Sequence, residues 1–199
     1  MDQGSRSMAP LFRCRDKVMD TQALRSAMPD RIRTERLVLR APCRADISAI
    51  ATLADNRKIH AMTTLPYPYS RHDAEAFVET FARSEAEHAY AIALPDDELI
   101  GMVGLHLDPG ADPEIGYWLG EPYWGRGYAT EAVGALLEAA RGTGHCTTLR
   151  AKARSENAAS RAVLEKLDFR YVGETVSGCG PHKDVPVASY ELTKSFGTP

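Results

Sequence analysis

The chain has 199 residues, of which 44% are hydrophobic and 26% are charged, and its formal net charge is -3. This composition is ordinary for one folded domain, and the slightly acidic balance excludes an overall basic field that would hold nucleic acid. No apolar run approaches the ~18 residues of a membrane span, and the first residues lack the apolar core of a secretory signal. We therefore expect a cytoplasmic protein with no nucleic-acid or membrane partner.

Cysteine and histidine usage gives no sign of a metal centre. No Cys-x-x-Cys pair occurs, and no histidine cluster accompanies the cysteines at metal-ligand spacing. We expect free thiols in a reducing compartment and interpret the scattered histidines as surface or packing residues. The residues concerned are Cys14, Cys43, Cys146, Cys179, His60, His72, His106 and His182.

The chain divides into an N-terminal extension over residues 1–32, a folded domain over 33–193 and a short tail over 194–199. The first 29 residues mix Pro, Gly and Ser with both charges and show no sustained period, apart from a short helix expected over 19–27. Residues 36–40 alternate between polar and apolar, which predicts the first strand. Residues 46–54 are predicted to form a short helix.

The next segment is a loop followed by a capped helix. Prolines at alternate positions of 65–69 oppose both helix and central strand. Ser70 and Asp73 form a capping box. Apolar residues then recur at helical spacing up to Phe81 and Ala82, so this helix is predicted to bury one face.

The second half predicts alternating strands and helices. Residues 89–94 and 99–107 flank a turn and are typical of a hairpin, and 114–119 forms a third strand. A long helix begins near Gly127 and ends at Gly142 and Gly144. A strand over 147–153, a helix to about residue 167, and strands over 169–172 and 185–192 follow. This order predicts an α+β fold, with a mixed, mostly antiparallel sheet of about seven strands and about four helices.

The most informative segment is the turn between the third strand and the long helix, at Trp124, Gly125, Arg126, Gly127, Tyr128, Ala129 and Thr130. Two glycines allow unusual dihedrals and close approach of a ligand. A helix N-terminus adds unpaired N–H groups and the positive end of the dipole. The combination suits a pyrophosphate, and Arg126 adds charge. Taken alone, Gly-x-Gly also fits a simple tight turn. A P-loop and a dinucleotide fingerprint both lack required residues here.

Three blocks together resemble the GNAT superfamily of acetyltransferases, in the branch that contains the ribosomal-protein alanine N-acetyltransferases. Residues 115–119 and 123–132 read Ile-Gly-Tyr-Trp-Leu and Tyr-Trp-Gly-Arg-Gly-Tyr-Ala-Thr-Glu-Ala. Residues 157–161 and 164–169 read Asn-Ala-Ala-Ser-Arg and Leu-Glu-Lys-Leu-Asp-Phe, and residues 34–40 read Thr-Glu-Arg-Leu-Val-Leu-Arg. The blocks follow the family order over roughly residues 33–193. The resemblance implies that the middle strands splay apart and that acetyl-CoA enters the gap.

Two positions depart from the family pattern. Trp124 stands where the superfamily often has Gln or Arg, so backbone amides must carry more of the pyrophosphate binding. Asp168 stands where the family usually has glycine, and Asp tolerates the left-handed conformation better than most residues.

The resemblance suggests where the chemistry takes place. Glu114, at the start of the strand beside the pantetheine arm, is the candidate base, although it also fits a solvated strand end. Ser160 is the candidate acid or thiol-positioning group, although it also fits an exposed first-turn serine. Asn157 is expected to bind the pantetheine arm, to cap its helix, or both.

Two further parts of the site are expected. Tyr117 and Trp118 face opposite sides of the strand, so one of them packs in the core, while Trp118 and the backbone of Leu119 join the cofactor site. The loop with Tyr67 and Tyr69 either shapes the acceptor pocket or is a rigid surface loop.

The expected activity is transfer of an acetyl group from acetyl-CoA to a primary amine, either a peptide N-terminus or a small-molecule amine, without a metal. Two alternatives stay open. One is a catalytically inactive CoA-binding regulatory or interaction domain, and the other is a nucleotide-binding protein. A homodimer also stays open, because dimers are frequent among similar proteins.

Overall fold

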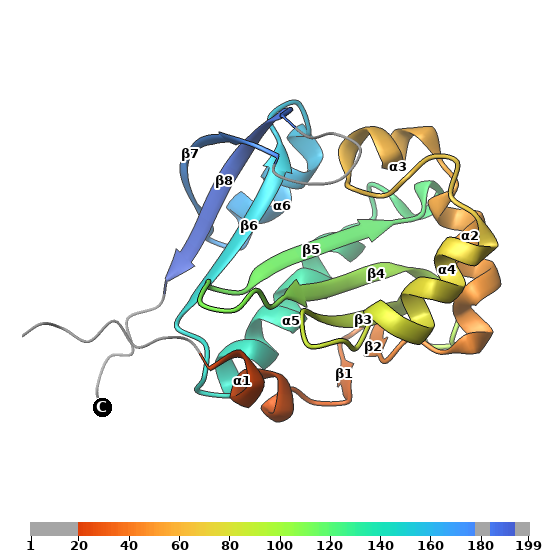
Figure 1. Ribbon diagram of the computed structural model, residues 1–199, viewed down its shortest axis with the longest axis horizontal. Helices are drawn as coiled ribbons and strands as arrows, with labels where there is room; N and C mark the ends of the chain where they lie inside the picture. Colours follow the sequence, from red (N-terminus) through yellow and green to blue (C-terminus); the bar gives the residue numbers. More distant parts are fainter. Residues whose placement is uncertain (1–19, 178–183, 194–199) are drawn as a thin grey trace, which may run out of the picture.

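A computed structural model describes residues 20–177 and 184–193. Within these residues the chain forms one eight-stranded sheet in the order β1-β2-β3-β4-β5-β6-β8-β7 (Figure 1). The strands are β1 (Arg31–Arg33), β2 (Val38–Arg40), β3 (Glu87–Ala93), β4 (Leu99–His106), β5 (Glu114–Leu119), β6 (Thr148–Arg154), β7 (Arg170–Val176) and β8 (Pro186–Thr193). The α-helices are α1 (Thr21–Ala27), α2 (Ile47–Ala54), α3 (Arg57–Met62), α4 (Arg71–Ala76), α5 (Tyr128–Gly142) and α6 (Ala158–Lys166).

The predicted α+β class is confirmed, with more elements than expected. Sequence periodicity missed β1 and α3, because an element of three or six residues is too short to show a period. The hairpin, the third strand, the long helix and the closing strands lie within a few residues of their predicted bounds. Asp168 has φ 62° after α6, which confirms the expected left-handed conformation.

The sheet is antiparallel except where β5 meets β6. These two strands are parallel and pair only at Glu114↔Arg150 and Ile115↔Ala151. Beyond this point they diverge, as Figure 1 shows. Residues 116–119 of β5 and 152–154 of β6 continue past the paired positions without pairing to each other. Their divergence opens a gap in the middle of the sheet.

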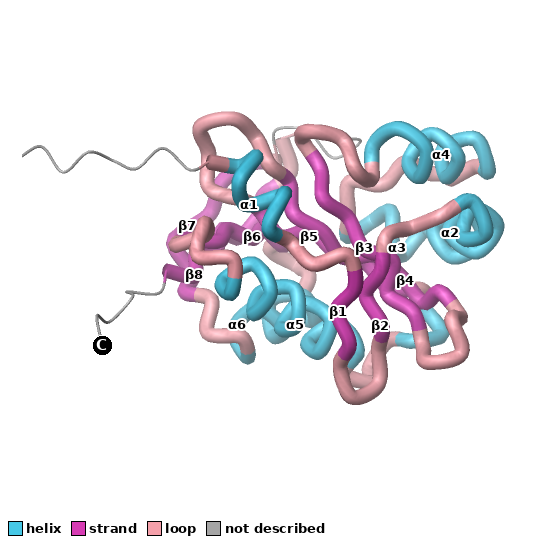
Figure 2. The backbone as a smooth tube through the Cα atoms, turned by 90° about the horizontal axis from the view of Figure 1, so that it is seen from below, coloured by secondary structure: helices cyan, strands magenta, loops and turns pink. Residues whose placement is uncertain are grey.

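Two hydrophobic cores lie on opposite faces of the sheet. The larger contains the apolar stripe of α5, including Val133 and Leu136, together with Leu164 of α6. The smaller packs Ile50 of α2 and Ala74 of α4 against the other face. Figure 2 shows α5 and α6 on one side of the strands and α2 and α4 on the other. The gap between β5 and β6 is therefore bordered by different helices on its two faces.

The described part of the predicted extension packs onto the sheet. β1 pairs antiparallel with β2, and Leu24 of α1 is fully buried in the larger core. Residues 1–19 and the predicted tail at 194–199 lie outside the described residues. Cys14, Cys179 and His182 lie outside them as well, whereas Cys43 and Cys146 are free thiols.

The helix after the Ser70 cap does not bury Phe81, contrary to the expectation. The capping box of Ser70 and Asp73 is present. Residues Phe77–Phe81 then form a π-helical turn, which changes the angular spacing of the side chains. Phe81 is 56% exposed as a result, while Ala82 remains buried.

Residues 20–177 and 184–193 contain neither a membrane-spanning helix nor a metal-binding cluster. No helix in this part of the chain combines the length and the apolar character needed to cross a bilayer. No group of three His, Cys, Asp or Glu side chains gathers there at metal-binding distance.

Candidate active site

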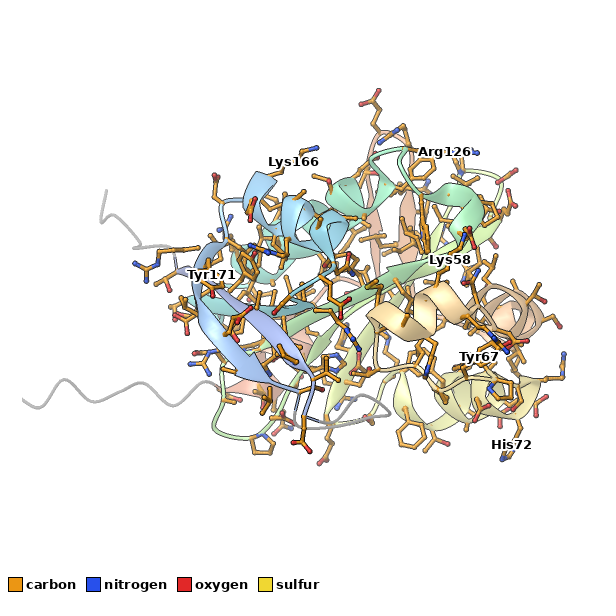
Figure 3. The ribbon with its side chains drawn as sticks, turned by 90° about the horizontal axis from the view of Figure 1, so that it is seen from above. Lys58, Tyr67, His72, Arg126, Lys166 and Tyr171 are labelled. Atoms are coloured by element: carbon orange, nitrogen blue, oxygen red, sulfur yellow. The ribbon has the colours of Figure 1, made fainter. Side chains whose placement is uncertain are left out.

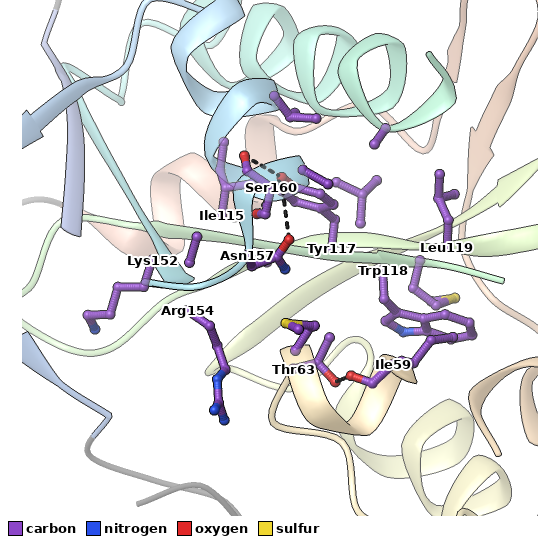
Figure 4. Close-up of a pocket in the computed structure, with 18 of the residues that line it drawn as sticks. Ile59, Thr63, Ile115, Tyr117, Trp118, Leu119, Lys152, Arg154, Asn157 and Ser160 are labelled. Carbon is purple, nitrogen blue, oxygen red and sulfur yellow. Dashed lines mark hydrogen bonds between the residues drawn. The ribbon is translucent and has the colours of Figure 1, made fainter. Parts of the chain in front are cut away.

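A cavity of about 1020 Å³ occupies the gap between β5 and β6. It reaches from the start of α5 past the first turn of α6 to α3 on the opposite face of the sheet (Figure 4). The tertiary structure brings nearly all of the predicted site residues to this cavity. They are Glu114, Trp118, Leu119, Trp124, Gly125, Gly127, Tyr128, Ala129, Thr130, Asn157 and Ser160.

The glycine loop has the geometry that the sequence predicted. Gly125 and Gly127 have φ values of 73° and 81°, in the left-handed region that disfavours other residues. A Cβ at Gly125 would meet nothing within 4 Å, so the space beside the loop is open. Gly127 is the N-cap of α5, and no side chain of the described residues caps this end of the helix. The first-turn N–H groups are therefore available to an anion.

Arg126 lies apart from the lining residues. Its side chain is exposed, and Figure 3 places it at the periphery of the molecule. Its carbonyl oxygen accepts a hydrogen bond from Nη1 of Arg36 at 3.0 Å. The residue thus takes part in holding the loop through its backbone.

Arg36 supports the loop from the turn between β1 and β2. Its Nε donates to Oε2 of Glu131 at 2.7 Å, and its guanidinium lies 4.8 Å from the centroid of the Tyr128 ring. Glu131 also accepts hydrogen bonds from the Thr34 hydroxyl and the Arg36 N–H. Burial opposes ionisation of Glu131, but these hydrogen bonds outweigh it and lower its pKa. From the sequence, residues 34–40 contributed only to the family resemblance, and this contact with the glycine loop was not predicted.

Trp124 closes the loop against β5. Its indole Nε1 donates to the carbonyl oxygen of Leu119 at 2.7 Å, and 42% of the residue stays exposed. The tryptophan therefore anchors the loop to the end of β5 and adds apolar surface to the mouth of the cavity.

Strand alternation places two aromatic residues on opposite faces of β5. Tyr117 packs against the larger core and Trp118 against the smaller one. The Tyr117 hydroxyl lies 2.8 Å from Oγ of Ser160. Burial raises the pKa of Tyr117 to about 12, despite the opposing effect of the Ser160 hydrogen bond. Two protonated hydroxyl groups thus meet in the middle of the cavity, and sequence reasoning had identified only that of Ser160.

Asn157 caps α6, as one of its two expected roles required. Its Oδ1 accepts the backbone N–H of Ser160 at 3.0 Å. This bond fixes the first turn of α6 and with it the position of Ser160 (Figure 4).

A row of charged side chains crosses the other face of the sheet. In register, Glu87 of β3 lies beside His106 of β4, and His106 lies beside Glu114 of β5. Glu87 forms an ion pair with His106, and this hydrogen bond is the main reason that the pKa of His106 is raised. Glu114 accepts a hydrogen bond from Nζ of Lys152 at 2.6 Å. His106 is thus part of the cavity wall, although the sequence suggested only a scattered residue.

The α3 region supplies the opposite wall. Thr63, Thr64 and Leu65 line the cavity. Tyr69 is buried in the smaller core, and Tyr67 lies beneath the guanidinium of Arg57 at 5.2 Å. This wall therefore begins at α3, before the loop over residues 65–69 that the sequence suggested.

Known proteins with the same architecture agree with this geometry. Residues 36–170, more than half of the chain, match the acetyltransferase (GNAT) domain. An uncharacterized N-acetyltransferase p20 of Bacillus licheniformis is 28% identical over 146 residues, which cover 70% of this chain and 82% of that protein. The structure of an acetyltransferase from Agrobacterium tumefaciens strain C58 is 29% identical with a TM-score of 0.63, covering 82% of this chain and 94% of the other.

A third likeness concerns the fold. A ribosomal L7/L12 alpha-N-protein acetyltransferase, solved in complex with coenzyme A, has a TM-score of 0.70 at 22% identity, over 82% of this chain and 97% of its own. The splayed strands, the glycine loop at the start of α5 and the family match lead to one conclusion: the chain belongs to the GNAT family and is an N-acetyltransferase.

Proposed function

We propose that the protein transfers an acetyl group from acetyl-CoA to a primary amine by direct attack of the amine on the thioester. The observation that carries this proposal is the arrangement of the cavity. An uncapped helix N-terminus lies at one end, and the Tyr117–Ser160 hydroxyl pair lies on one side of β5. The carboxylate of Glu114 lies on the other side.

Several residues fit acetyl-CoA as a substrate. The open space beside Gly125 and the free donors of Tyr128, Ala129 and Thr130 suit the pyrophosphate. Leu119 and Asn157 line the cavity between this loop and Ser160 and suit the pantetheine arm, and Trp118 lines it from the face of the smaller core. The acetyl end would then reach the region where β5 and β6 begin to separate.

Glu114 is proposed to accept the proton of the amine. An amine attacks only as the free base. An α-amine with a pKa near ~7.8 is neutral about once in seven at pH 7, whereas a lysine side chain near ~10.4 is neutral about once in 2,500. A modest base is therefore sufficient for an α-amine, directly or through water.

The hydroxyl pair is proposed to serve the leaving group. The amine nitrogen bonds to the carbonyl carbon and forms a tetrahedral intermediate. When this intermediate collapses, the carbon–sulfur bond breaks, and the thiolate that leaves needs a proton. Ser160 can donate it and regain a proton from solvent water once the thiol has left, with Tyr117 supplying a hydrogen bond to the serine oxygen. The high pKa of Tyr117 keeps its hydroxyl protonated throughout the neutral range.

The test is a thiol-release assay with acetyl-CoA and a panel of acceptors that covers peptide N-termini, amino acids, polyamines and amino sugars. We expect CoA release that depends on one acceptor class, together with a mass increase of one acetyl group on that acceptor. Acetyl-CoA should also raise the melting temperature, since a ligand at 100 times its dissociation constant adds about 2.7 kcal/mol of stability.

Two results would contradict the proposal. Binding of CoA without turnover on any acceptor would favour an inactive CoA-binding domain. Retention of ATP or NAD in place of CoA would favour a nucleotide-binding protein.

A further inference from the structure

We propose that Arg154 recognises a carboxylate on the acceptor, so that the preferred substrate is an amine that also carries an acid group. This inference rests on the proposed function, because it concerns the acceptor side of the same cavity. Both a free amino acid and a peptide with an acidic residue next to its N-terminus have this chemistry.

The position of Arg154 places it on the acceptor side. Ala151 and Ala153 of β6 are buried in the larger core, so Lys152 and Arg154 face the opposite way. Figure 4 shows the Arg154 side chain extending from β6 toward the side where Thr63, just after α3, lies, away from Ser160. Both Arg154 and Thr63 line the cavity.

The guanidinium is buried with unused donors. The side chain of Arg154 is 16% exposed, and its Nη2 lies 3.1 Å from Oε1 of Glu156. The atoms Nε and Nη1 are buried and have no hydrogen-bond partner among residues 20–177 and 184–193. Leaving a buried, charged donor unpaired is costly. A planar fork with two free N–H positions is suited to bind a carboxylate.

Neighbouring acids do not neutralise this charge. Glu114 is paired with Lys152, and Glu87 is paired with His106. Glu156 has a side chain that is 69% exposed, and exposed pairs contribute little. Arg83 also has two buried nitrogens without partners, but its guanidinium lies 4.7 Å from the centroid of the Tyr90 ring. Arg154 is therefore a buried positive charge of the cavity wall whose hydrogen-bond donors are only partly used by the described residues.

The spacing of Glu114 and Arg154 along the sheet separates the amine of the acceptor from its carboxylate. Glu114 is in register with Arg150, four residues before Arg154 on β6. Four residues of strand span about 13 Å between Cα atoms, and the long Arg154 side chain shortens the gap. An acceptor would place its amine near Glu114 and its carboxylate toward Arg154.

The experiment compares acceptors that differ only in the acid group. One arm uses ω-amino acids of increasing length beside the simple amines of equal length. A second arm uses dipeptide amides with Glu or Gln in the second position. We expect kcat/KM to be about 10- to 100-fold higher for the acids, and the arm with the larger preference identifies the source of the carboxylate.

The variants are Arg154→Met and the control Arg150→Met. Arg150 lies on the same strand, but it contacts Asp112 and Glu191. Arg154→Met should remove the preference for acids and change kcat/KM for uncharged amines less than about threefold, while Arg150→Met should keep the preference. Circular dichroism checks that each variant is folded. The comparison of acceptors with the wild-type protein still tests the inference if a variant does not fold.

Calorimetric titration of acceptors into the CoA complex keeps the test independent of turnover. Tighter binding of the acids, lost in Arg154→Met, would support the inference even if no acceptor reacted and the proposed activity failed. Equal use and equal binding of acids and uncharged amines by the wild type would overturn the inference and leave the acetyl transfer standing. A preference that persists in folded Arg154→Met would also overturn it.

Discussion

The two sides of the cavity are built from different parts of the chain. The proposed cofactor side comes from two short segments, the loop at Gly125–Thr130 and the first turn of α6, and the loop presents backbone donors. The acceptor side is assembled from single side chains on β3, β4, β5, β6 and α3. Backbone donors at a helix N-terminus suit the same pyrophosphate whatever the acceptor is, whereas isolated side chains can change one by one with the acceptor. If these proposed roles are correct, recognition of the cofactor depends on neighbouring residues, and recognition of the acceptor depends on contacts between distant parts of the chain.

The largest effect is expected from Gly127→Val. The residue has φ 81°, which strains a β-branched side chain, and its Cβ would lie 3.4 Å from Nη2 of Arg36, which holds the loop. Acetyl-CoA should bind about 100-fold more weakly in a calorimetric titration. The control is Gly142→Val at the far end of α5, where a Cβ meets nothing within 4 Å. Normal binding by folded Gly127→Val, with binding lost in Arg126→Ala, would show that the side chain carries the phosphate.

The second-largest effect is expected from the Tyr117–Ser160 hydroxyl pair, which lies on the proposed cofactor side and is proposed to protonate the leaving thiolate. Ser160→Ala should lower kcat by about 100-fold, and Tyr117→Phe by less, because it acts through the serine. Neither change should weaken acetyl-CoA binding more than about threefold.

The pH dependence sharpens this prediction. Since the pKa of Tyr117 is about 12, the phenol stays protonated at all pH values well below 12. The Tyr117→Phe deficit should therefore be constant between about pH 6 and 9. A deficit that varies across this range would assign Tyr117 a proton-transfer role of its own. A deficit only in acetyl-CoA affinity would make both hydroxyls binding groups.

A smaller effect is expected from Glu114→Gln on the acceptor side. If the carboxylate accepts the proton of the amine, kcat/KM should fall about 10-fold, and the acid limb of its pH profile should then follow the ionisation of the acceptor amine alone. Glu138→Gln, which removes an exposed carboxylate from α5, should leave the profile unchanged. An unaltered acid limb in Glu114→Gln would remove Glu114 from the mechanism.

The smallest effects separate the two arginines around the glycine loop. Arg36→Met removes contacts to Glu131, Tyr128 and the Arg126 carbonyl, so acetyl-CoA affinity should fall about 5- to 10-fold through loss of loop order. Arg126→Met removes an exposed charge, and a change of about twofold that shrinks with salt is expected. Equal losses in the two variants at high salt would contradict a positioning role for Arg36.

Sequence patterns predicted the elements that have a clear period or a punctuating residue. The capping box at Ser70, the start of α5 after Gly127 and the cap at Asn157 are all present. β1 and α3 are too short for periodicity. The exposure of Phe81 depends on a π-helical turn that the apolar spacing does not reveal.

The candidate site divides in the same way. A glycine turn before a helix needs only neighbouring residues to have the correct dihedrals, so local patterns were enough to predict the loop at Gly125–Thr130 and the capped turn that holds Ser160. The pairing of Tyr117 with Ser160 spans 43 positions, and that of Glu114 with Lys152 spans 38. Such contacts depend on strand order, register and the face that each side chain takes, which no local pattern contains. For that reason only the folded chain shows which charges line the α3 side of the cavity, and that Nε and Nη1 of Arg154 have no hydrogen-bond partner among the described residues.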